Sequence, residues 1–181
     1  MAIRTILTQG DPVLNKVCHP VTRFDQKLAD LLDDLKQTLE EANGMGLAAP
    51  QVGILRRAVI VVVGEDEMLE LVNPEILAQS GEELGWEGCL SLPGMWGKVQ
   101  RPSWVKLRAQ DRFGNWFETE GTEVTARCFC HELEHLDGHM YDEHTDRLYT
   151  AEELDEILAQ EEDGEQTQAR ARGQRRRRRR A

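Results

Sequence analysis

Residues 131–135 read His-Glu-Leu-Glu-His and bring two imidazoles and two carboxylates into one short segment. Because residues four apart lie on one face of an α-helix, the imidazoles of His131 and His135 can bind the same ion. Glu132 lies beside them and can take a proton from a water molecule, whose pKa a divalent ion lowers from about 16 to roughly 7. The segment therefore predicts a metal site with its own general base.

Two imidazoles leave this site one ligand short, because catalytic ions of this kind usually have three protein ligands and an open position. Zinc peptidases with the same helix take the third ligand from a downstream histidine, but position 141 is Tyr. His139 lies about 12 Å along a straight helix from His131, which is too far for metal–nitrogen bonds of about 2 Å. The third ligand is therefore expected upstream.

Residues 86–91 read Trp-Glu-Gly-Cys-Leu-Ser and supply the missing donor. Glycines at 85 and 88 let the backbone come close to a ligand, and Cys89 offers a thiolate. A third segment, residues 44–53, combines three glycines and two alanines with the amide of Gln51. Its exposed backbone suits an extended substrate, and Gln51 can donate an N–H to a developing oxyanion.

The three segments, in this order and at this separation, resemble the signature motifs of the peptide deformylase family. The motifs correspond to residues 44–51, 87–91 and 131–135, and the resemblance covers roughly residues 3 to 160. It implies removal of the formyl group from the N-terminal formylmethionine of nascent polypeptides, with formate as the second product. It also implies Fe(II) as the native metal, with Zn(II), Ni(II) or Co(II) as substitutes.

The resemblance assigns a role to each motif residue. The implied metal ligands are Cys89, His131 and His135. Glu132 becomes the general acid and base, the oxyanion hole consists of Gln51 and the Leu90 amide, and Gly46 hydrogen-bonds the main chain of the substrate. Arg101 resembles the family arginine that borders the second motif, so we expect it to pair with Glu87 and orient the Cys89 loop.

The methionine side chain of the substrate needs an apolar slot, which the resemblance places at Met45, Trp86, Val124 and Cys128. Two positions depart from the family pattern. Arg127 stands where the family often has an aliphatic residue, so either its stem lines the slot and its head reaches solvent, or the local alignment is shifted by a turn. Cys130 replaces a common Gln, and we expect it to pack as a small buried residue.

Helical and strand patterns around these motifs predict one α+β domain. Leucines at helical spacing predict an amphipathic helix that Thr22 caps and Gly44 ends, at positions 28, 31, 32, 35 and 39. Residues 58–63, 69–72 and 105–109 read as strands, and residues 113–115 as a hairpin turn. The third motif lies on a helix that starts near residue 123, so mixed or antiparallel strands surround a central metal-binding helix.

A last helix is predicted after residue 150, where Thr-Ala-Glu-Glu forms a capping box and Leu154, Ile157 and Leu158 point inward. Length and a hydrophobic content of 40% suit a single catalytic domain, residues 1–164. We find no secretory signal and no apolar run long enough for a membrane span. A cytoplasmic protein of a bacterium, or an organellar one, is therefore expected.

Residues 165–181 differ sharply from the rest of the chain. They contain eight arginines and one glutamate, a net charge of +7, and since the whole chain carries −11, residues 1–164 carry −18. Such a tail is predicted to be disordered. It could bind ribosomal RNA through phosphate contacts, or remain solvated or fold back on the acidic body, and charge patterning favours neither.

Two alternative functions remain open at this point. A metallopeptidase would use the same helix with Glu143 or Asp146 as the third ligand, and would not need Cys89 to bind its metal. An RNA-binding module would hold a purely structural metal with four ligands, and would give Glu132 no role.

Overall fold

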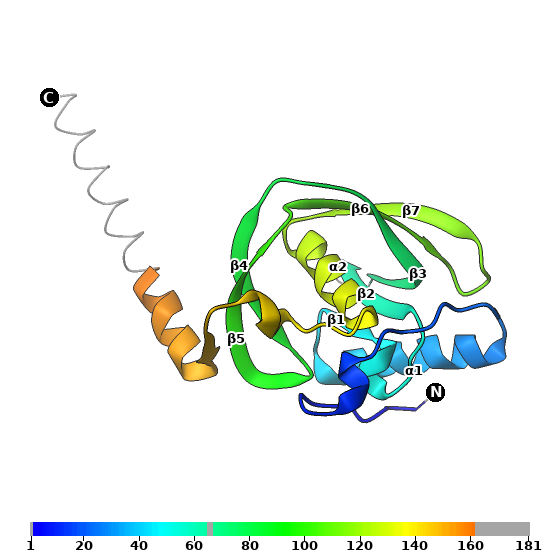
Figure 1. The fold of residues 1–181 in the computed structure, drawn as a ribbon, viewed down its shortest axis with the longest axis horizontal. Coiled ribbons are helices and arrows are strands. Elements are labelled where there is room, and N and C mark those ends of the chain that lie inside the picture. The colour runs from blue at the N-terminus through cyan, green and yellow to red at the C-terminus, as the bar shows by residue number, and fades with distance from the viewer. Residues whose placement is uncertain (1, 65–66, 162–181) are drawn as a thin grey trace, which may run out of the picture.

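The computed structural model describes residues 2–64 and 67–161 of the 181-residue chain. In this part of the chain, helix α2 (Glu123–Leu136) lies at the centre with strands around it, and α1 (Gln26–Ala42) lies at the periphery (Figure 1). Short 3₁₀ turns cover Pro12–Asn15, Ala49–Val52 and Tyr141–His144. The predicted α+β class with a central helix is confirmed. The predicted boundary at residue 164 and the tail 165–181 lie outside the described residues.

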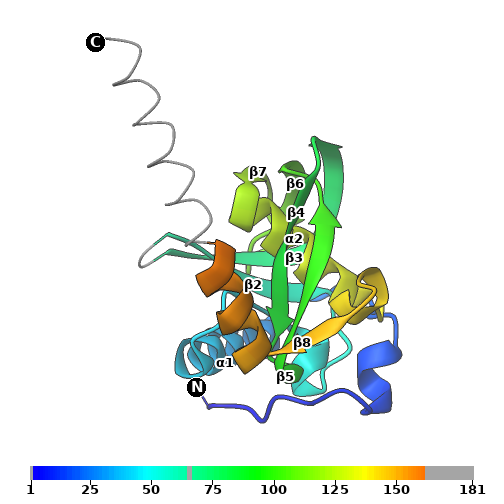
Figure 2. The same cartoon turned by 90° about the vertical axis from the view of Figure 1, so that its left-hand side faces the viewer.

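Two antiparallel sheets provide the strands. The larger sheet has the order β1-β2-β3-β6-β7, with bounds Gly46–Ala48, Ala58–Gly64, Glu67–Ser80, Trp104–Gln110 and Trp116–Thr122. The smaller sheet has the order β4-β5-β8, with bounds Glu83–Cys89, Leu92–Arg101 and Leu148–Thr150, and Figure 2 shows these strands side by side. Within the described residues, no helix has the length and apolar character needed to cross a membrane.

Helix α1 forms because its leucines share one face, and all five of the predicted positions are buried. Burying each such side chain contributes about 1.5–3 kcal/mol. The predicted cap was wrong: Asp25, not Thr22, accepts the Leu28 N–H at 3.3 Å, since its carboxylate stands directly before the first helical residue. Asn43, in the left-handed conformation, ends the helix one residue before Gly44.

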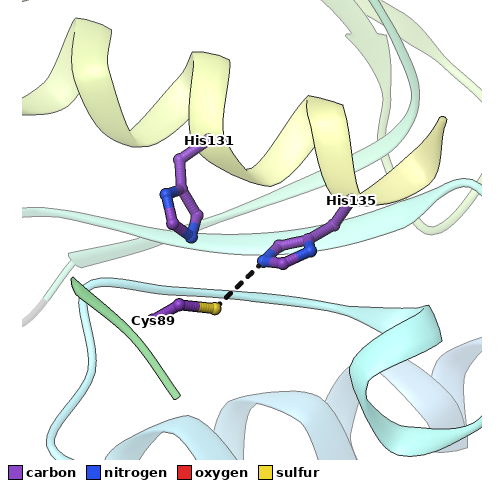
Figure 3. A group of neighbouring side chains, drawn as sticks. All are labelled: Cys89, His131 and His135. Atoms are coloured by element: carbon purple, nitrogen blue, oxygen red, sulfur yellow. Dashed lines mark hydrogen bonds between the residues drawn. The ribbon is translucent and has the colours of Figure 1, made fainter. Parts of the chain in front are cut away.

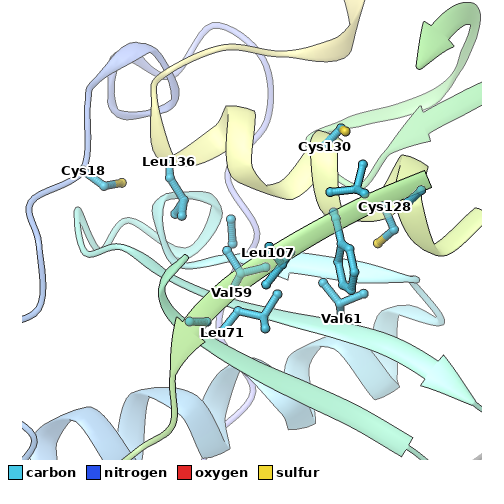
Figure 4. Packing of buried hydrophobic residues seen from close by; sticks show 13 residues of the cluster. Cys18, Val59, Val61, Leu71, Leu107, Cys128, Cys130 and Leu136 are labelled. Carbon is cyan, nitrogen blue, oxygen red and sulfur yellow. The ribbon is translucent and has the colours of Figure 1, made fainter. Parts of the chain in front are cut away.

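Strand β2 divides the core into two layers because its side chains alternate between the faces of the sheet. Ala58 and Ile60 pack with the leucines of α1, whereas Val59 and Val61 pack with α2. Figure 4 shows the second layer, a cluster to which the buried Cys130 belongs together with Leu136 and Leu107. The predicted packing role of Cys130 is thus confirmed. Both layers hold β1 and α2, which carry the first and third motifs, in fixed positions.

Strand β3 has 14 residues, more than three times the length that the sequence indicates. A strand was expected at 69–72 only, and Pro74, a residue that seldom continues a regular strand, lies just beyond it. The structure continues the strand through a bulge, where Asn73 has φ 48° and the register with β6 shifts between Val72 and Glu75. The predicted hairpin turn is confirmed, with Gly114 at φ 89° between β6 and β7.

The last predicted helix is present at residues 151–161. Its capping box is confirmed, since Thr150 N–H donates to Glu153 Oε2 at 2.9 Å and Glu153 N–H donates to Thr150 Oγ1 at 3.3 Å. Leu154 is buried, but Leu158 is 39% exposed, so its predicted inward position was wrong. This helix follows β8, and Glu161 at its end pairs with Lys98 of β5 at 3.2 Å.

Candidate metal centre

The thiol of Cys89 and the imidazoles of His131 and His135 converge on one point (Figure 3). Their donor atoms all lie within 4.8 Å of one another, and Cys89 Sγ is 3.3 Å from His135 Nε2. The imidazoles extend from successive turns of α2, and the thiol reaches them from the end of β4. One sulfur and two nitrogens at this spacing suit a first-row divalent ion in a site with an open position. The residues present therefore fit a metal ion.

Two N–H groups point at the sulfur of Cys89. The Ser91 backbone N–H donates at 3.4 Å and Gln51 Nε2 at 3.5 Å. A Cβ at the preceding Gly88 would lie 3.0 Å from the ring of Trp96 on the paired strand, so a larger residue there would require this ring to shift. These two donors hold the Cys89 sulfur in place beside the imidazoles.

Glu87 fixes the orientation of His131. Its carboxylate is buried, and Oε2 accepts the Nδ1–H of His131 at 2.9 Å, so that Nε2 is left for a metal. The predicted pair with Arg101 is confirmed, with Nε–Oε1 at 2.8 Å and Nη2–Oε2 at 3.1 Å. Burial raises the pKa of Glu87, but hydrogen bonds from His131 and Arg101 outweigh it and lower the pKa to about 2. The carboxylate therefore stays ionised beneath the imidazole.

Glu132 is buried beside the three donors, and among the described residues its Oε2 has no hydrogen-bond partner. Burial raises its pKa to about 7, against a lowering influence of His131. Gly46 on β1 packs directly against the carboxylate, and a Cβ there would overlap it. A buried carboxyl group with one oxygen available, in the lining of the same cavity as Cys89 and His131, can accept and return a proton.

Gln51 is held rigidly. Its Oε1 accepts the Ala48 N–H at 2.8 Å, and its Nε2 donates to Ser91 Oγ at 3.1 Å, so the NH₂ group faces Cys89. Leu90, whose amide was the other predicted oxyanion donor, lines the same cavity as Gln51. The structure thus brings the predicted oxyanion-hole residues to the donor set.

A cavity of about 480 Å³ opens beside this site. Its lining includes all four residues predicted for the methionine slot, Met45, Trp86, Val124 and Cys128, and also Gly46, Gln51 and Glu132. Met45 and Val124 are 49% and 59% exposed, whereas Cys128 is buried. Exposed apolar side chains at the mouth and a buried wall leave a slot that leads to the metal centre.

Arg127 lines the cavity, as the first of the two sequence hypotheses predicted, but the predicted exposure of its head was wrong. Its head does not reach solvent: the side chain is buried, and the guanidinium donates to Glu87 Oε1 at 2.9 Å, Val99 O at 2.7 Å and Glu83 O at 2.8 Å. The alignment shift is also unnecessary, because Arg127 lines the cavity as its position predicts. A ring of backbone acceptors, which no local sequence pattern shows, makes the burial of this charge possible.

Sequence reasoning missed Tyr141 and Glu134. The ring of Tyr141 stacks on His131 with centroids 5.8 Å apart, and its hydroxyl donates to Met95 O at 2.9 Å. Glu134 pairs with Arg101, with Nη1–Oε1 at 2.5 Å. The signal for Glu134 was its place one helical turn after His131, but Tyr141 reaches the site through a turn that only the tertiary fold defines.

The alternative ligands of the peptidase hypothesis lie elsewhere. Glu143 accepts from His139 Nδ1 at 2.9 Å and from the Met140 N–H at 3.2 Å, and Asp146 is exposed. Among the described residues, the donor group at the site has three members, not the four of a structural ion. Neither alternative function is favoured.

Comparisons with known proteins agree with this geometry. The family model described as polypeptide deformylase matches residues 3–151. The peptide deformylase of Agathobacter rectalis is 55% identical over 141 residues, which cover 78% of this chain and 89% of that protein. Peptide deformylase 1 of Bacillus subtilis is 46% identical over 155 residues, which cover 85% of this chain and 97% of that protein.

Solved structures give the same result. The crystal structure of peptide deformylase from Thermotoga maritima superposes with a TM-score of 0.78 and 36% identity, covering 81% of this chain and 100% of that one. A peptide deformylase from Legionella pneumophila superposes with a TM-score of 0.78 and 36% identity, covering 93% of this chain and 99% of that one. The chain belongs to the peptide deformylase family of metal-dependent hydrolases.

Proposed function

We propose that this protein removes the formyl group from the N-terminal formylmethionine of nascent polypeptides and releases formate. The observation that carries the proposal is the placement of the unpartnered Glu132 carboxylate oxygen beside the donor set, at the end of an apolar slot. A base, a metal site and a side-chain slot in one cavity are what hydrolysis of a small N-terminal amide requires.

Cys89, His131 and His135 would hold the metal. When bound, a divalent cation lowers the pKa of a water molecule and polarises the formyl oxygen. We propose Fe(II) as the native ion, and Zn(II), Ni(II) or Co(II) as substitutes, since one thiolate and two imidazoles accept all four. The hydrogen bond from His131 Nδ1 to Glu87 supports this role, because it fixes the tautomer that leaves Nε2 as a donor.

Glu132 would act as general base and then as general acid. Its carboxylate takes the proton from the attacking water and returns it to the amine nitrogen that leaves as the C–N bond breaks. Burial of the side chain supports this role, because bulk water does not compete for the proton. The amine product is the methionine N-terminus, and the acid product is formate.

Gln51 and the Leu90 amide would stabilise the oxyanion that develops on the formyl oxygen. The support is the fixed amide of Gln51, whose oxygen is held by the Ala48 N–H and whose NH₂ group faces the site. A donor held in place before reaction loses no free energy in orienting itself. Loss of one such donor costs about 3 kcal/mol of transition-state stabilisation.

The substrate peptide would lie along β1. This strand is at the edge of the larger sheet, so an extended peptide can add to it by backbone hydrogen bonds, with Gly46 as one partner. The methionine side chain then enters the slot formed by Met45, Trp86, Val124 and Cys128. These side chains are apolar or weakly polar, which favours an unbranched thioether over a charged side chain.

Residues 1–164 would carry the catalytic function, and the arginine-rich residues 165–181 would bring it to ribosomal RNA in the cytoplasm. The support is a net charge of +7 in a segment of 17 residues, since neutralised phosphates supply affinity without sequence specificity. Co-sedimentation with ribosomes should decrease when the chain is truncated after residue 164, and more strongly at low salt. Equal binding of both chains would contradict the role of the tail.

The deformylase function is tested by substrate choice. Fe(II)-loaded protein, prepared without oxygen, should release formate from formyl-Met-Ala, and should release neither acetate from acetyl-Met-Ala nor alanine from Met-Ala. Release of alanine without formate would instead support the peptidase. Folded, metal-loaded protein that releases none of these products would contradict the proposal.

A further inference from the structure

We propose that Arg127 is a positioning residue: its guanidinium holds the Glu87 carboxylate in the orientation in which Glu87 fixes the metal ligand His131. Arg127 thereby connects the wall of the substrate slot to Glu87, which holds the metal ligand His131. Only the activity readout of this proposal rests on the proposed function.

The guanidinium of Arg127 has one set position. Nη1 lies 2.9 Å from Glu87 Oε1 and 2.7 Å from Val99 O, and Nη2 lies 2.8 Å from Glu83 O. The residue is 8% exposed, so these acceptors, and not bulk water, surround the charge. Because its acceptors belong to β4 and β5, Arg127 ties these strands to α2 one turn before His131.

The contacts of Glu87 show what Arg127 adds. Oε1 accepts from Arg101 Nε and Arg127 Nη1, and Oε2 accepts from Arg101 Nη2 and His131 Nδ1. Each carboxylate oxygen thus has two donors. Without Arg127, the carboxylate could turn within the fork of Arg101, and the bond from Oε2 to His131 would lose its fixed direction.

The distribution of charge also assigns Arg127 to Glu87. Arg101 is shared, because it pairs with Glu134 as well, through Nη1–Oε1 at 2.5 Å and Nη2–Oε2 at 2.9 Å. Among the described residues, Glu87 is the only carboxylate that pairs with Arg127. The positive charge of Arg101 is divided between Glu87 and Glu134, and Arg127 supplies Glu87 with a second positive charge. Glu87 in turn holds His131.

Gly85 keeps the space for this guanidinium. A Cβ at Gly85 would lie 2.7 Å from Arg127 Nη2 and 2.9 Å from Cζ, closer than real Cβ contacts allow. An added methyl group would push the guanidinium away from Glu83 O and from Glu87. Gly85→Ala thus offers a second way to displace Arg127 without changing Arg127 itself.

Replacement of Arg127 by methionine distinguishes a role in positioning Glu87 from a role in lining the slot. Arg127→Met keeps an unbranched stem against the cavity but removes the donors to Glu87. Arg127→Lys keeps a cation but not the planar fork. Arg112→Met is the matched control, because Arg112 is likewise an arginine held by ion pairs, with the carboxylates of Asp33 and Glu70, but belongs to the β6–β7 turn away from the site.

The test uses the full chain in two forms. Cobalt-loaded protein gives the visible absorption of the bound ion, and chelator competition gives the zinc affinity. We expect Arg127→Met and Gly85→Ala to shift the cobalt bands and to weaken zinc binding about tenfold, the usual effect of losing support for a metal ligand. The double variant Gly85→Ala/Arg127→Met should bind zinc no more weakly than Arg127→Met alone. Arg127→Lys should recover part of the zinc affinity. Arg112→Met should change neither the cobalt bands nor the zinc affinity.

In the Fe(II) enzyme, we expect Arg127→Met to lower kcat about tenfold while KM stays within about twofold. Unchanged cobalt bands and zinc affinity would overturn the proposal, as would a variant that changes KM alone, which would make Arg127 a lining residue. If Arg127→Met does not fold, Arg127→Lys and Gly85→Ala decide in its place. Because the cobalt and zinc readouts need no formate release, they test Arg127 even if the proposed function fails.

Discussion

Gly46 packs against the carboxylate of Glu132 so closely that no larger residue fits between strand β1 and helix α2. This contact joins the first motif to the third. The contact is a steric reason for a glycine at position 46, in addition to the substrate hydrogen bond that the family resemblance implies.

The first prediction concerns this contact. Gly46→Ala should displace the Glu132 carboxylate and lower kcat for formate release at least about tenfold, since general acid–base catalysis depends on a positioned carboxyl group. Metal content should be unchanged. Gly64→Ala is the control, because a Cβ there meets its nearest atom at 3.5 Å, an ordinary contact. An active Gly46→Ala enzyme would show that Glu132 does not need this position.

The second prediction concerns the oxyanion hole. Gln51→Ala should lower kcat by about 10²–10³-fold with little change in KM, because the lost donor acts on the developing charge. Ser91→Ala removes one partner of Gln51 but leaves its oxygen bound to the Ala48 N–H, so the expected loss is smaller. Steady-state formate release measures both. Equal loss in the two variants would contradict a direct role for Gln51.

The third prediction concerns metal retention. Cys89→Ala should lose the metal during gel filtration, whereas Cys130→Ala should keep one ion per chain, because Cys130 is buried in the core on another face of α2. Added Zn(II) should raise the melting temperature of the parent protein but not of Cys89→Ala, since a ligand stabilises only the state that binds it. Elemental analysis and thermal unfolding measure these effects. A metal retained by Cys89→Ala would favour the peptidase ligand set.

The fourth prediction concerns acid stability. Burial raises the pKa of Glu70, but hydrogen bonds from Arg112 and Lys36 outweigh it and lower the pKa. This group therefore stabilises the fold above its unfolded pKa of about 4.3, and the contribution is lost as the pH falls through the folded pKa. Glu70→Gln should lower the free energy of unfolding at pH 7 by about 1 kcal/mol and flatten its decline in acid.

Urea unfolding between pH 3 and pH 7 measures this dependence. The control is Glu75→Gln, since Glu75 pairs with Arg108 at the surface, where both side chains are about half exposed and such pairs contribute little. A parent protein and a Glu70→Gln variant with parallel pH profiles would show that the Glu70 pairs do not stabilise the fold.

Spacing and residue type predicted the residues of the site better than they predicted the residues that hold them in place. His131 and His135 share a helix face at any α-helical geometry, and the leucine stripe of α1 required only periodicity. Arg127, by contrast, is buried because backbone carbonyls of two other strands surround its head, and Tyr141 reaches His131 through a turn fixed by the tertiary fold. Contacts of this kind join distant segments and leave no local pattern.

The predicted end of β3 and the predicted start of α1 were wrong for a related reason. Pro74 ends a regular strand, but the left-handed Asn73 lets β3 continue through a bulge because β6 is available as a partner. Likewise, Thr22 and Asp25 are both good caps, and only the path of the chain into α1 selects Asp25. Local residue preferences allow more than one strand end and more than one helix cap, and tertiary packing selects among them.

The role of Glu132 is tested most directly by replacing it with Gln and measuring formate release and bound metal in the same Fe(II)-loaded samples. We expect one ion per chain in both proteins, formate from formyl-Met-Ala with the parent protein, and at least about 10²-fold less with Glu132→Gln. Near-parental release by metal-loaded Glu132→Gln would contradict the assignment of Glu132 as the proton carrier, and no release by the metal-loaded parent would contradict the deformylase function itself.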